Sequence, residues 1–240
     1  MIRGALRSLR IYRNPAHLQS LARFCAEELA PGARLVFDIG AHAGDRVAAF
    51  RRMGARVIAL EPQATMANLL RALHFRDPGV TVLRAACGPA PGRAELRVNS
   101  RNPTVSTLST EFLESTRGAA GWEGQVWDRR VSTELKTLDQ LVETYGLPDF
   151  VKIDVEGFEA EVLAGLTAPV PRLSFEVTTA ARGAGLAALE RAMFIGFQGF
   201  RLSLGESHRW ETGWLSGPAM RARLEGLPEA ANSGDVLAVR

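Results

Sequence analysis

The sequence predicts an α/β fold in which helices flank a mostly parallel β-sheet. Short apolar runs, such as those over residues 35–39 and 56–60, stop abruptly at Gly40 and at Glu61. Runs of this kind are typical of strands that are buried on both faces of a sheet. Segments of helical spacing separate the runs, and this alternation indicates parallel strands joined by crossover helices.

The same reasoning assigns the individual elements. We expect strands over residues 35–39, 56–60, 80–83, 94–98, 150–155, 173–177, 199–204 and 236–240. We expect helices over residues 45–53, 65–75, 138–145, 159–166 and 186–195. Partial alternation over residues 126–135 indicates a further extended segment.

One main domain is expected. Leu18, Leu21 and Cys25 recur at helical spacing, which predicts an N-terminal helical segment over residues 1–32. Residues 33–240 then form the sheet domain, and its hydrophobic share suits one buried core, since 46% of the 240 residues are hydrophobic. A polar insertion at about residues 99–135 is rich in Ser, Thr and Gly and is expected to form a loop or lid.

The composition argues against a membrane protein and against a nucleic-acid partner. No apolar run of about 18 residues is present, so we expect no membrane span. No secretory signal is expected, and two cysteines cannot build a disulfide framework, which favours a reducing, cytoplasmic setting. We interpret the N-terminal arginines as a solvated helix face, because they lack the repeated aromatic residues of a nucleic-acid groove. These arginines are Arg3, Arg7, Arg10 and Arg13.

A glycine turn follows the first expected strand. The segment Asp38-Ile39-Gly40-Ala41-His42-Ala43-Gly44 lies directly before a helix. Glycine lets the backbone turn sharply and approach a ligand closely. The G-x-x-x-G spacing differs from the G-x-G-x-x-G that cradles a pyrophosphate, which favours a nucleoside without phosphates. An ordinary strand-to-helix turn explains the glycines equally well.

Glu61 favours the ligand hypothesis. It ends the second strand about twenty residues after the glycine turn, where an acidic side chain can accept hydrogen bonds from the ribose hydroxyls of a nucleoside. Ligands of open α/β sheets bind at this edge of the sheet.

A third group of polar residues lies on a later apolar strand. Lys152 and Asp154 point to the same side of it, and a buried lysine needs a carboxylate partner because an unpaired buried charge is costly. Asp154 and Glu156 fall at the carboxyl end of the strand. We therefore expect neighbouring strand ends to bring Gly40, Glu61 and Asp154 around one crevice.

Together these segments resemble the FkbM-type methyltransferases. The resemblance rests on Phe37-Asp38-Ile39-Gly40-Ala41, Leu60-Glu61-Pro62, Thr137-Leu138-Asp139 and, most specifically, Asp149-Phe150-Val151-Lys152-Ile153-Asp154-Val155-Glu156-Gly157. It runs from about residue 35 to residue 177. It implies a Rossmann-like class I methyltransferase fold with a seven-stranded, mostly parallel sheet, helices on both faces, and S-adenosyl-L-methionine as cofactor.

The resemblance also implies a set of binding residues. The expected cofactor-binding residues are Asp38, Gly40, Ala41, His42, Gly44, Glu61, Pro62, Gln63, Ala86 and Asp154. Glu61 would hold the ribose, and the turn containing Ala86 would lie against the adenine. His42 stands where the family often has an asparagine.

Known members methylate hydroxyl groups of natural products or sugars, so we expect an O-methyltransferase with a small-molecule or sugar acceptor. A hydroxyl acceptor must lose its proton, and a positioned base helps. The expected catalytic residues are Asp154, Glu156 and His42, with Glu176 and His208 as further candidates for the base. No H-x-x-x-H cluster is present, so no metal is expected.

The sequence also indicates where the acceptor pocket lies and leaves two alternative functions open. The insertion, with the aromatic segment from Trp210 to Trp214, is expected to form and cover the acceptor pocket, unless these tryptophans are packing anchors. A homodimer is compatible with the sequence. The alternatives are an NAD-dependent oxidoreductase, which the missing third glycine disfavours, and a catalytically silent nucleoside-binding module.

Overall fold

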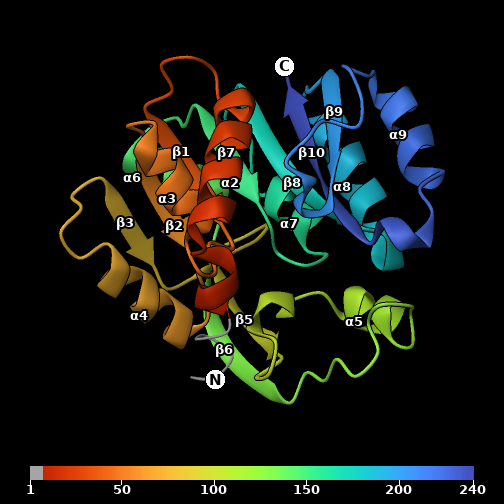
Figure 1. Cartoon of the computed structure of the whole chain (residues 1–240), viewed down its shortest axis with the longest axis horizontal. Coiled ribbons are helices and arrows are strands. Elements are labelled where there is room, and N and C mark those ends of the chain that lie inside the picture. Colours follow the sequence, from red (N-terminus) through yellow and green to blue (C-terminus); the bar gives the residue numbers. More distant parts are fainter. Residues whose placement is uncertain (1–7) are drawn as a thin grey trace.

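The computed structural model describes residues 8–240, and its centre is a seven-stranded sheet of order β3–β2–β1–β7–β8–β10–β9 (Figure 1). The strands are β1 (Leu35–Ile39), β2 (Arg56–Leu60), β3 (Val80–Leu83), β7 (Phe150–Ile153), β8 (Arg172–Thr178), β9 (Gly199–Leu204) and β10 (Ser233–Val239). Neighbours pair in parallel except that β10 is antiparallel to both β8 and β9. The predicted seven-stranded α/β fold is therefore confirmed.

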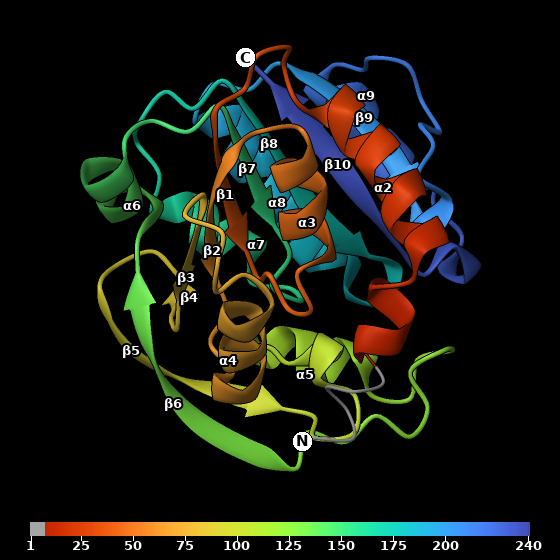
Figure 2. The ribbon, with the colours of Figure 1, turned by 60° about the vertical axis from the view of Figure 1, so that its left-hand side comes forward.

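Helices cover both faces of this sheet (Figures 1 and 2). One face packs against α2 (Pro15–Glu28), α3 (Asp45–Arg52) and α4 (Ala64–Leu73). The other packs against α6 (Leu138–Tyr145), α7 (Glu159–Ala164), α8 (Arg182–Phe194) and α9 (Gly217–Glu225). The strands β1, β2, β7 and β10 are buried on both sides, because their alternate residues enter two different hydrophobic clusters.

A second, smaller sheet of order β4–β6–β5 joins the end of the insertion to the two strands that precede it. Its strands are β4 (Ala86–Cys87), β5 (Gly92–Val98) and β6 (Arg129–Lys136), and between β5 and β6 lie the 3-10 helix η1 (Pro103–Val105) and α5 (Thr110–Thr116). The insertion lies across the carboxyl ends of the parallel strands (Figure 1). It is therefore placed to wall off whatever binds at that edge.

The sequence did not predict three of these elements. α5 and α9 begin at Ser109 and Ser216, whose side chains accept a hydrogen bond from the helix backbone, but both helices lie in polar, Ser- and Gly-containing stretches that looked like loops. β4 has two residues, too few for a periodic pattern. β10 starts at Ser233, three positions before the expected strand over 236–240, and so includes Asp235.

A buried chain of ion pairs joins the N-terminal helix to the sheet. Glu28 of α2 accepts from Arg46 of α3 at 2.8 Å, and Arg46 also pairs with Asp235 of β10. Asp235 pairs in turn with Lys152 of β7, whose ammonium lies 3.4 Å from Asp154. Glu28 and Lys152 have fully buried side chains. Charges removed from water in this way are stable only when they stay paired.

Arg46→Met tests this chain of charges. The variant leaves Glu28 without a cationic partner and Asp235 with Lys152 alone, and we expect the free energy of unfolding to fall by about 3–5 kcal/mol. Arg221→Met, at an exposed pair with Glu190, should leave the denaturation midpoint nearly unchanged. Urea unfolding curves measure both variants. Equal effects would show that the buried chain does not stabilise the fold.

Candidate active site

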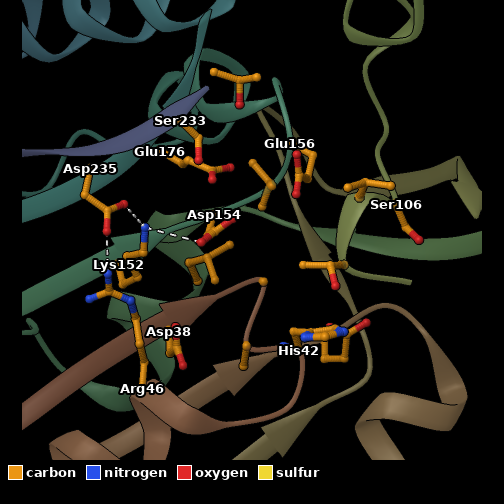
Figure 3. A pocket seen from close by; sticks show the side chains of 18 of the residues that line it. Asp38, His42, Arg46, Ser106, Lys152, Asp154, Glu156, Glu176, Ser233 and Asp235 are labelled. Atoms are coloured by element: carbon orange, nitrogen blue, oxygen red, sulfur yellow. Dashed lines mark hydrogen bonds and ion pairs between the residues drawn. The ribbon is translucent and has the colours of Figure 1, made fainter. Parts of the chain in front are cut away.

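A cavity of about 530 Å³ opens at the carboxyl ends of β1, β2 and β7 (Figure 3). It brings together almost all of the residues singled out in the sequence. Those that line it are Asp38, Gly40, Ala41, His42, Glu61, Pro62, Gln63, Ala86, Asp154 and Glu156. Glu176 and His208 line it as well, whereas Gly44 does not.

A row of carboxylates crosses the sheet at this edge. Ile39 of β1 pairs with Leu60 on one side and with Ile153 on the other. One position further along each strand, and on the other face, the row contains Glu61, Gly40, Asp154, Glu176 and Asp235 in order across the sheet. The register of the sheet, rather than any one loop, therefore gathers the acids.

The glycines of the turn are required by the packing of the chain itself. Gly40 has φ of +89°, and a Cβ atom there would lie 1.8 Å from the carbonyl oxygen of Asp154. Gly44 has φ of +74°, and its Cβ atom would lie 2.4 Å from a methyl group of Leu70. A side chain at either position is thus excluded by protein atoms before any ligand is considered. Because Gly40 has no side chain, the centre of the carboxylate row is backbone alone, and it lies directly against the backbone of Asp154.

Asp38 and Glu61 are buried carboxyl groups beside this turn. Asp38 is 2% exposed, and its Oδ2 has no hydrogen-bond partner among the described residues. Glu61 is also 2% exposed and accepts the backbone N–H groups of His42, at 3.1 Å, and of Gln63, at 2.7 Å. Burial raises the pKa of Asp38 to about 7 and that of Glu61 to about 7. Both groups therefore retain capacity for a hydrogen-bond donor from a ligand.

Asp154, Glu156 and Glu176 lie close together further along the row, with carboxylate oxygens within 4.8 Å of one another (Figure 3). Asp154 is the accessible one, since its side chain is 39% exposed. Glu156 is 7% exposed and has a left-handed backbone, with φ of +55°, while its carbonyl accepts the Thr107 hydroxyl at 2.7 Å. Burial, and then the charge of Asp154, raise the pKa of both Glu156 and Glu176.

His42 lines the cavity from the glycine turn. Its Nε2 lies 3.3 Å from the Ser8 hydroxyl, and the Tyr12 ring meets it edge-on at 5.7 Å between centroids. Burial lowers the pKa of His42, so the imidazole is neutral near pH 7. Its backbone N–H, rather than its ring, contacts Glu61.

The insertion forms the wall opposite the carboxylate row. Gln63 donates to the carbonyl of Pro103 at 3.0 Å, and Trp127 donates to the carbonyl of Val105 at 2.7 Å. These bonds fix the segment that carries Thr104 and Ser106 against the cavity. The expectation that the insertion helps to enclose a pocket thus agrees with its position.

The tryptophans and arginines outside the cavity have other partners. Trp210 packs on Phe24 of α2, with 4.7 Å between ring centroids, and neither Trp210 nor Trp214 lines the cavity. Their expected place in the acceptor pocket is therefore not observed, and Trp210 serves as a packing anchor. Arg13 donates to the carbonyl of Gly44 at 3.0 Å, so this arginine is not merely solvated. Arg3 and Arg7 lie outside the described residues.

Sequence reasoning missed Arg46 and Asp235. It required a carboxylate partner for Lys152, and Asp235 is that partner together with Asp154. Asp235 was overlooked because it precedes the apolar run that marked the last strand, and its antiparallel pairing with Glu176 cannot be derived from local pattern. Arg46 stands in the first turn of α3, where nothing distinguishes it from a surface arginine.

The cavity has the chemistry that a nucleoside with an amino-acid tail requires. Its acidic groups can accept hydrogen bonds from ribose hydroxyls and from an ammonium group, and the free Oδ2 of Asp38 has capacity for one such donor. Apolar side chains from Leu60, Leu96 and Phe158 offer a surface on which the nucleobase of a nucleoside can pack. The FkbM methyltransferase domain model matches residues 38–202.

The chain belongs to the FkbM methyltransferase family. S-adenosylmethionine is accordingly the cofactor of this FkbM methyltransferase. No curated protein matches the sequence. Among the described residues, no helix has the length and apolar character needed to cross a membrane.

Several solved structures are similar to this FkbM methyltransferase over most of their length. A precorrin-6y C5,15-methyltransferase from Geobacter metallireducens has 14% identity and a TM-score of 0.48, covering 92% of this chain and 88% of its own. A TehB-like SAM-dependent methyltransferase from Corynebacterium glutamicum has 11% identity and a TM-score of 0.48, covering 98% and 97%. An O-methyltransferase from Bacillus cereus in complex with SAH has 13% identity and a TM-score of 0.46, covering 99% and 90%.

Glu61 predicts a pH-dependent difference in stability. Burial raises its pKa from 4.5 to about 7, so the folded protein holds a proton that the unfolded chain has already released, and folding loses stability as the pH rises through that window. Glu61→Gln does not titrate there. We expect the unfolding free energy of the variant, relative to the parent, to increase by up to about 3 kcal/mol between about pH 4.5 and pH 8. Urea unfolding without cofactor measures this; a constant difference would contradict the assigned pKa shift.

Proposed function

We propose that this methyltransferase transfers a methyl group to a hydroxyl oxygen of a small-molecule or sugar acceptor, with Asp154 as the base. The observation that carries the proposal is the position of Asp154. It is the accessible carboxylate of the row, it stands next to Gly40, and Lys152 pairs with it at 3.4 Å from inside the sheet. A carboxylate held in this way can receive a proton at an oxygen that faces the cavity.

The cofactor would be held at the β1–β2 side of the cavity. Glu61 is proposed to accept the ribose hydroxyls, and Asp38 to accept the ammonium group of the methionine end. Pro62, Gln63 and Ala86 would flank the adenosine. When bound, the cofactor supplies an electrophilic methyl group on a positively charged sulfur. The chain has to align an acceptor with that group and exclude water.

The acceptor is proposed to enter between the row of carboxylates and the insertion. Thr104 and Ser106 face the cavity from the insertion and can position polar groups of an acceptor. As the acceptor oxygen attacks, its hydroxyl proton passes to a carboxylate oxygen of Asp154. Lys152 would hold that carboxylate in place through its ion pair. Glu156 and Glu176, whose pKa values are raised, would enter this step as neutral groups that donate hydrogen bonds to the acceptor.

His42 is the second candidate for the base. Burial lowers the pKa of its imidazole, which leaves the ring able to accept a proton near pH 7. Its Nε2, however, is already within 3.3 Å of the Ser8 hydroxyl. Among the described residues, no hydroxyl group hydrogen-bonds to the carboxylate of Asp154, and we therefore favour it. We also propose a reducing, cytoplasmic setting, since Cys25 and Cys87 are buried and unpaired.

A binding and turnover experiment tests the proposed function. Purified protein is titrated calorimetrically with S-adenosylhomocysteine and with NAD, and incubated with S-adenosylmethionine and panels of sugar, polyketide and amine acceptors, with products read by mass spectrometry. We expect binding of the adenosyl ligand, none of NAD, and a mass increase of one methyl group on hydroxyl acceptors. Methylation confined to amines or carbon would overturn the assignment of oxygen as the acceptor atom.

Asp154→Asn separates the role of this residue in turnover from any role in binding. Asparagine keeps the shape but cannot take up the hydroxyl proton, so we expect turnover to fall by about 100-fold or more. The affinity for S-adenosylhomocysteine should change by less than about threefold. Glu61→Ala is the comparison variant, in which cofactor binding is the property expected to change. It should weaken the affinity for S-adenosylhomocysteine by about 1.5–3 kcal/mol for each charge-assisted hydrogen bond lost. Full turnover by Asp154→Asn would remove Asp154 as the base.

A further inference from the structure

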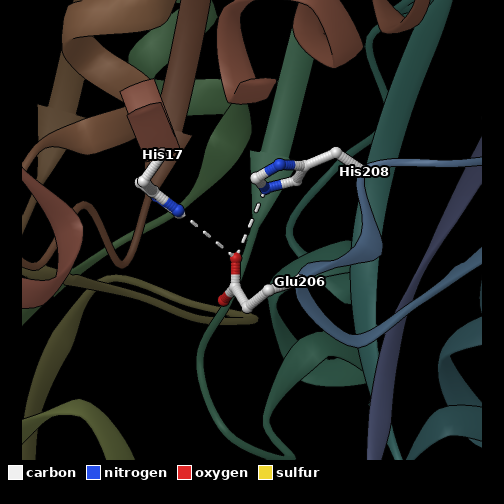
Figure 4. Close-up of side chains that lie close together, drawn as sticks. All are labelled: His17, Glu206 and His208. Atoms are coloured by element: carbon white, nitrogen blue, oxygen red, sulfur yellow. Dashed lines mark ion pairs between the residues drawn. The ribbon is translucent and has the colours of Figure 1, made fainter. Parts of the chain in front are cut away.

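A cluster of two histidines and a glutamate lies at the rim of the cavity, outside the carboxylate row (Figure 4). His17 comes from α2, while Glu206 and His208 come from the 3-10 helix η3 (Gly205–Ser207) and its end. Glu206 Oε2 lies 3.3 Å from His208 Nε2 and 4.0 Å from His17 Nδ1. One ligand-type atom of each residue lies within 4.8 Å of those of the other two.

The far nitrogen of each ring is already held by a neighbouring side chain. His17 Nε2 lies 3.0 Å from Asp45 Oδ2, and His208 Nδ1 lies 2.9 Å from the Ser20 hydroxyl. A carboxylate only accepts, so His17 carries a proton on Nε2, and its Nδ1 faces Glu206, where the neutral ring would offer a lone pair to an ion. Histidines that bind metals are oriented in the same manner, with the second nitrogen bonded to a carboxylate or other polar group.

The spacing of the three inward-facing atoms matches ligands around one ion better than hydrogen bonds between them. Charge-assisted hydrogen bonds from nitrogen to a carboxylate are about 2.7–2.9 Å long, shorter than both separations here. Ligand atoms at about 2.1 Å from a tetrahedral zinc ion lie about 3.4 Å apart. The observed 3.3 Å and 4.0 Å separations bracket that value.

We propose that His17, Glu206 and His208 bind one divalent transition-metal ion of the zinc type. Two imidazoles and a carboxylate form a donor set that zinc uses in proteins, whereas harder cations such as magnesium prefer oxygen ligands. Three protein ligands leave one position for water. The sequence shows no metal motif here because His17 lies 189 and 191 positions before the other two ligands.

The site would join the N-terminal helix to η3 beside the opening of the cavity. Glu206, His208 and Asp45 line that opening. His208 has φ of +50°, a left-handed conformation that is uncommon for residues other than glycine. The strained backbone directs the ring inward, and a bound ion would tie α2 to the rim. This proposal stands independently of the identity of the methyl acceptor.

Calorimetric titration of the chelator-treated full chain with zinc chloride, supported by the visible absorption of added Co²⁺, tests the site. We expect one ion per chain and a Co²⁺ spectrum typical of tetrahedral coordination. His208→Asn should lower zinc affinity by at least about tenfold, as should Glu206→Gln, and Ser20→Ala should lower it by about tenfold through the ring orientation. Asparagine tolerates the left-handed backbone at 208, and Glu206 is 69% exposed, so both variants should fold.

Matched controls localise the ion. His74→Ala removes a histidine outside the cluster, and Glu156→Gln removes one member of the group of three carboxylates. Both should retain zinc affinity within about twofold. No zinc binding by the parent chain would overturn the proposal, and so would equal binding by the parent and His208→Asn. Loss of binding in Glu156→Gln alone would assign the ion to the carboxylate row instead.

Discussion

The ammonium group of Lys152 is the interaction on which the rest of the site depends. It is fully buried in the centre of the sheet, and it pairs with Asp235 and with Asp154, both of which line the cavity. Arg46 pairs with the same Asp235 and carries the network to Glu28 on the outer helix. The nearby charges of Asp235 and Asp154 outweigh the effect of burial and raise the pKa of Lys152, so the lysine stays charged. This buried positive charge lowers the electrostatic cost of placing several carboxyl groups side by side.

The cavity region contains more acidic groups than cations to pair with them, and this excess determines its chemistry. Arg46 and Lys152 are the cations that pair with Glu28, Asp235 and Asp154. Among the described residues, no cation forms an ion pair with Glu61 or Glu176. Burial without a paired cation raises the pKa values of Glu61, Glu156 and Glu176 and so favours their neutral forms. One accessible carboxylate among neutral, hydrogen-bonding carboxyl groups is the arrangement that a proton acceptor needs. An ion pair with Lys152 distinguishes Asp154 from Glu61, Glu156 and Glu176 among the described residues.

Much of this arrangement is visible in the sequence, because it depends on strand ends. Strands β1, β2 and β3 have the predicted bounds, and parallel strands place their carboxyl ends at one edge. Glu61 and Asp154 could be placed from that rule alone. Asp235 could not, because it reaches the site on an antiparallel strand whose register with β8 is fixed by tertiary packing. The same holds for His17 and His208, which meet only after the N-terminal helix packs beside η3.

The turn after β1 shows a different limit of sequence reasoning. The sequence left two explanations for the glycines at 40 and 44, room for a ligand or an ordinary strand-to-helix turn, and in the structure both glycines lie against atoms of the protein itself. Gly40 lies against the backbone of Asp154 at the cavity, and Gly44 lies against the side chain of Leu70 of α4. A pattern of glycines reports close contact but not the identity of the contacting group.

A crystal structure of the protein with S-adenosylhomocysteine tests the central claim most directly. The account predicts electron density for the ligand inside the cavity, with hydrogen bonds to Glu61 and Asp38 and with the Lys152–Asp154 ion pair intact. Ligand density outside the row of carboxylates, or a cavity in which Lys152 has left Asp154 and Asp235, would contradict it.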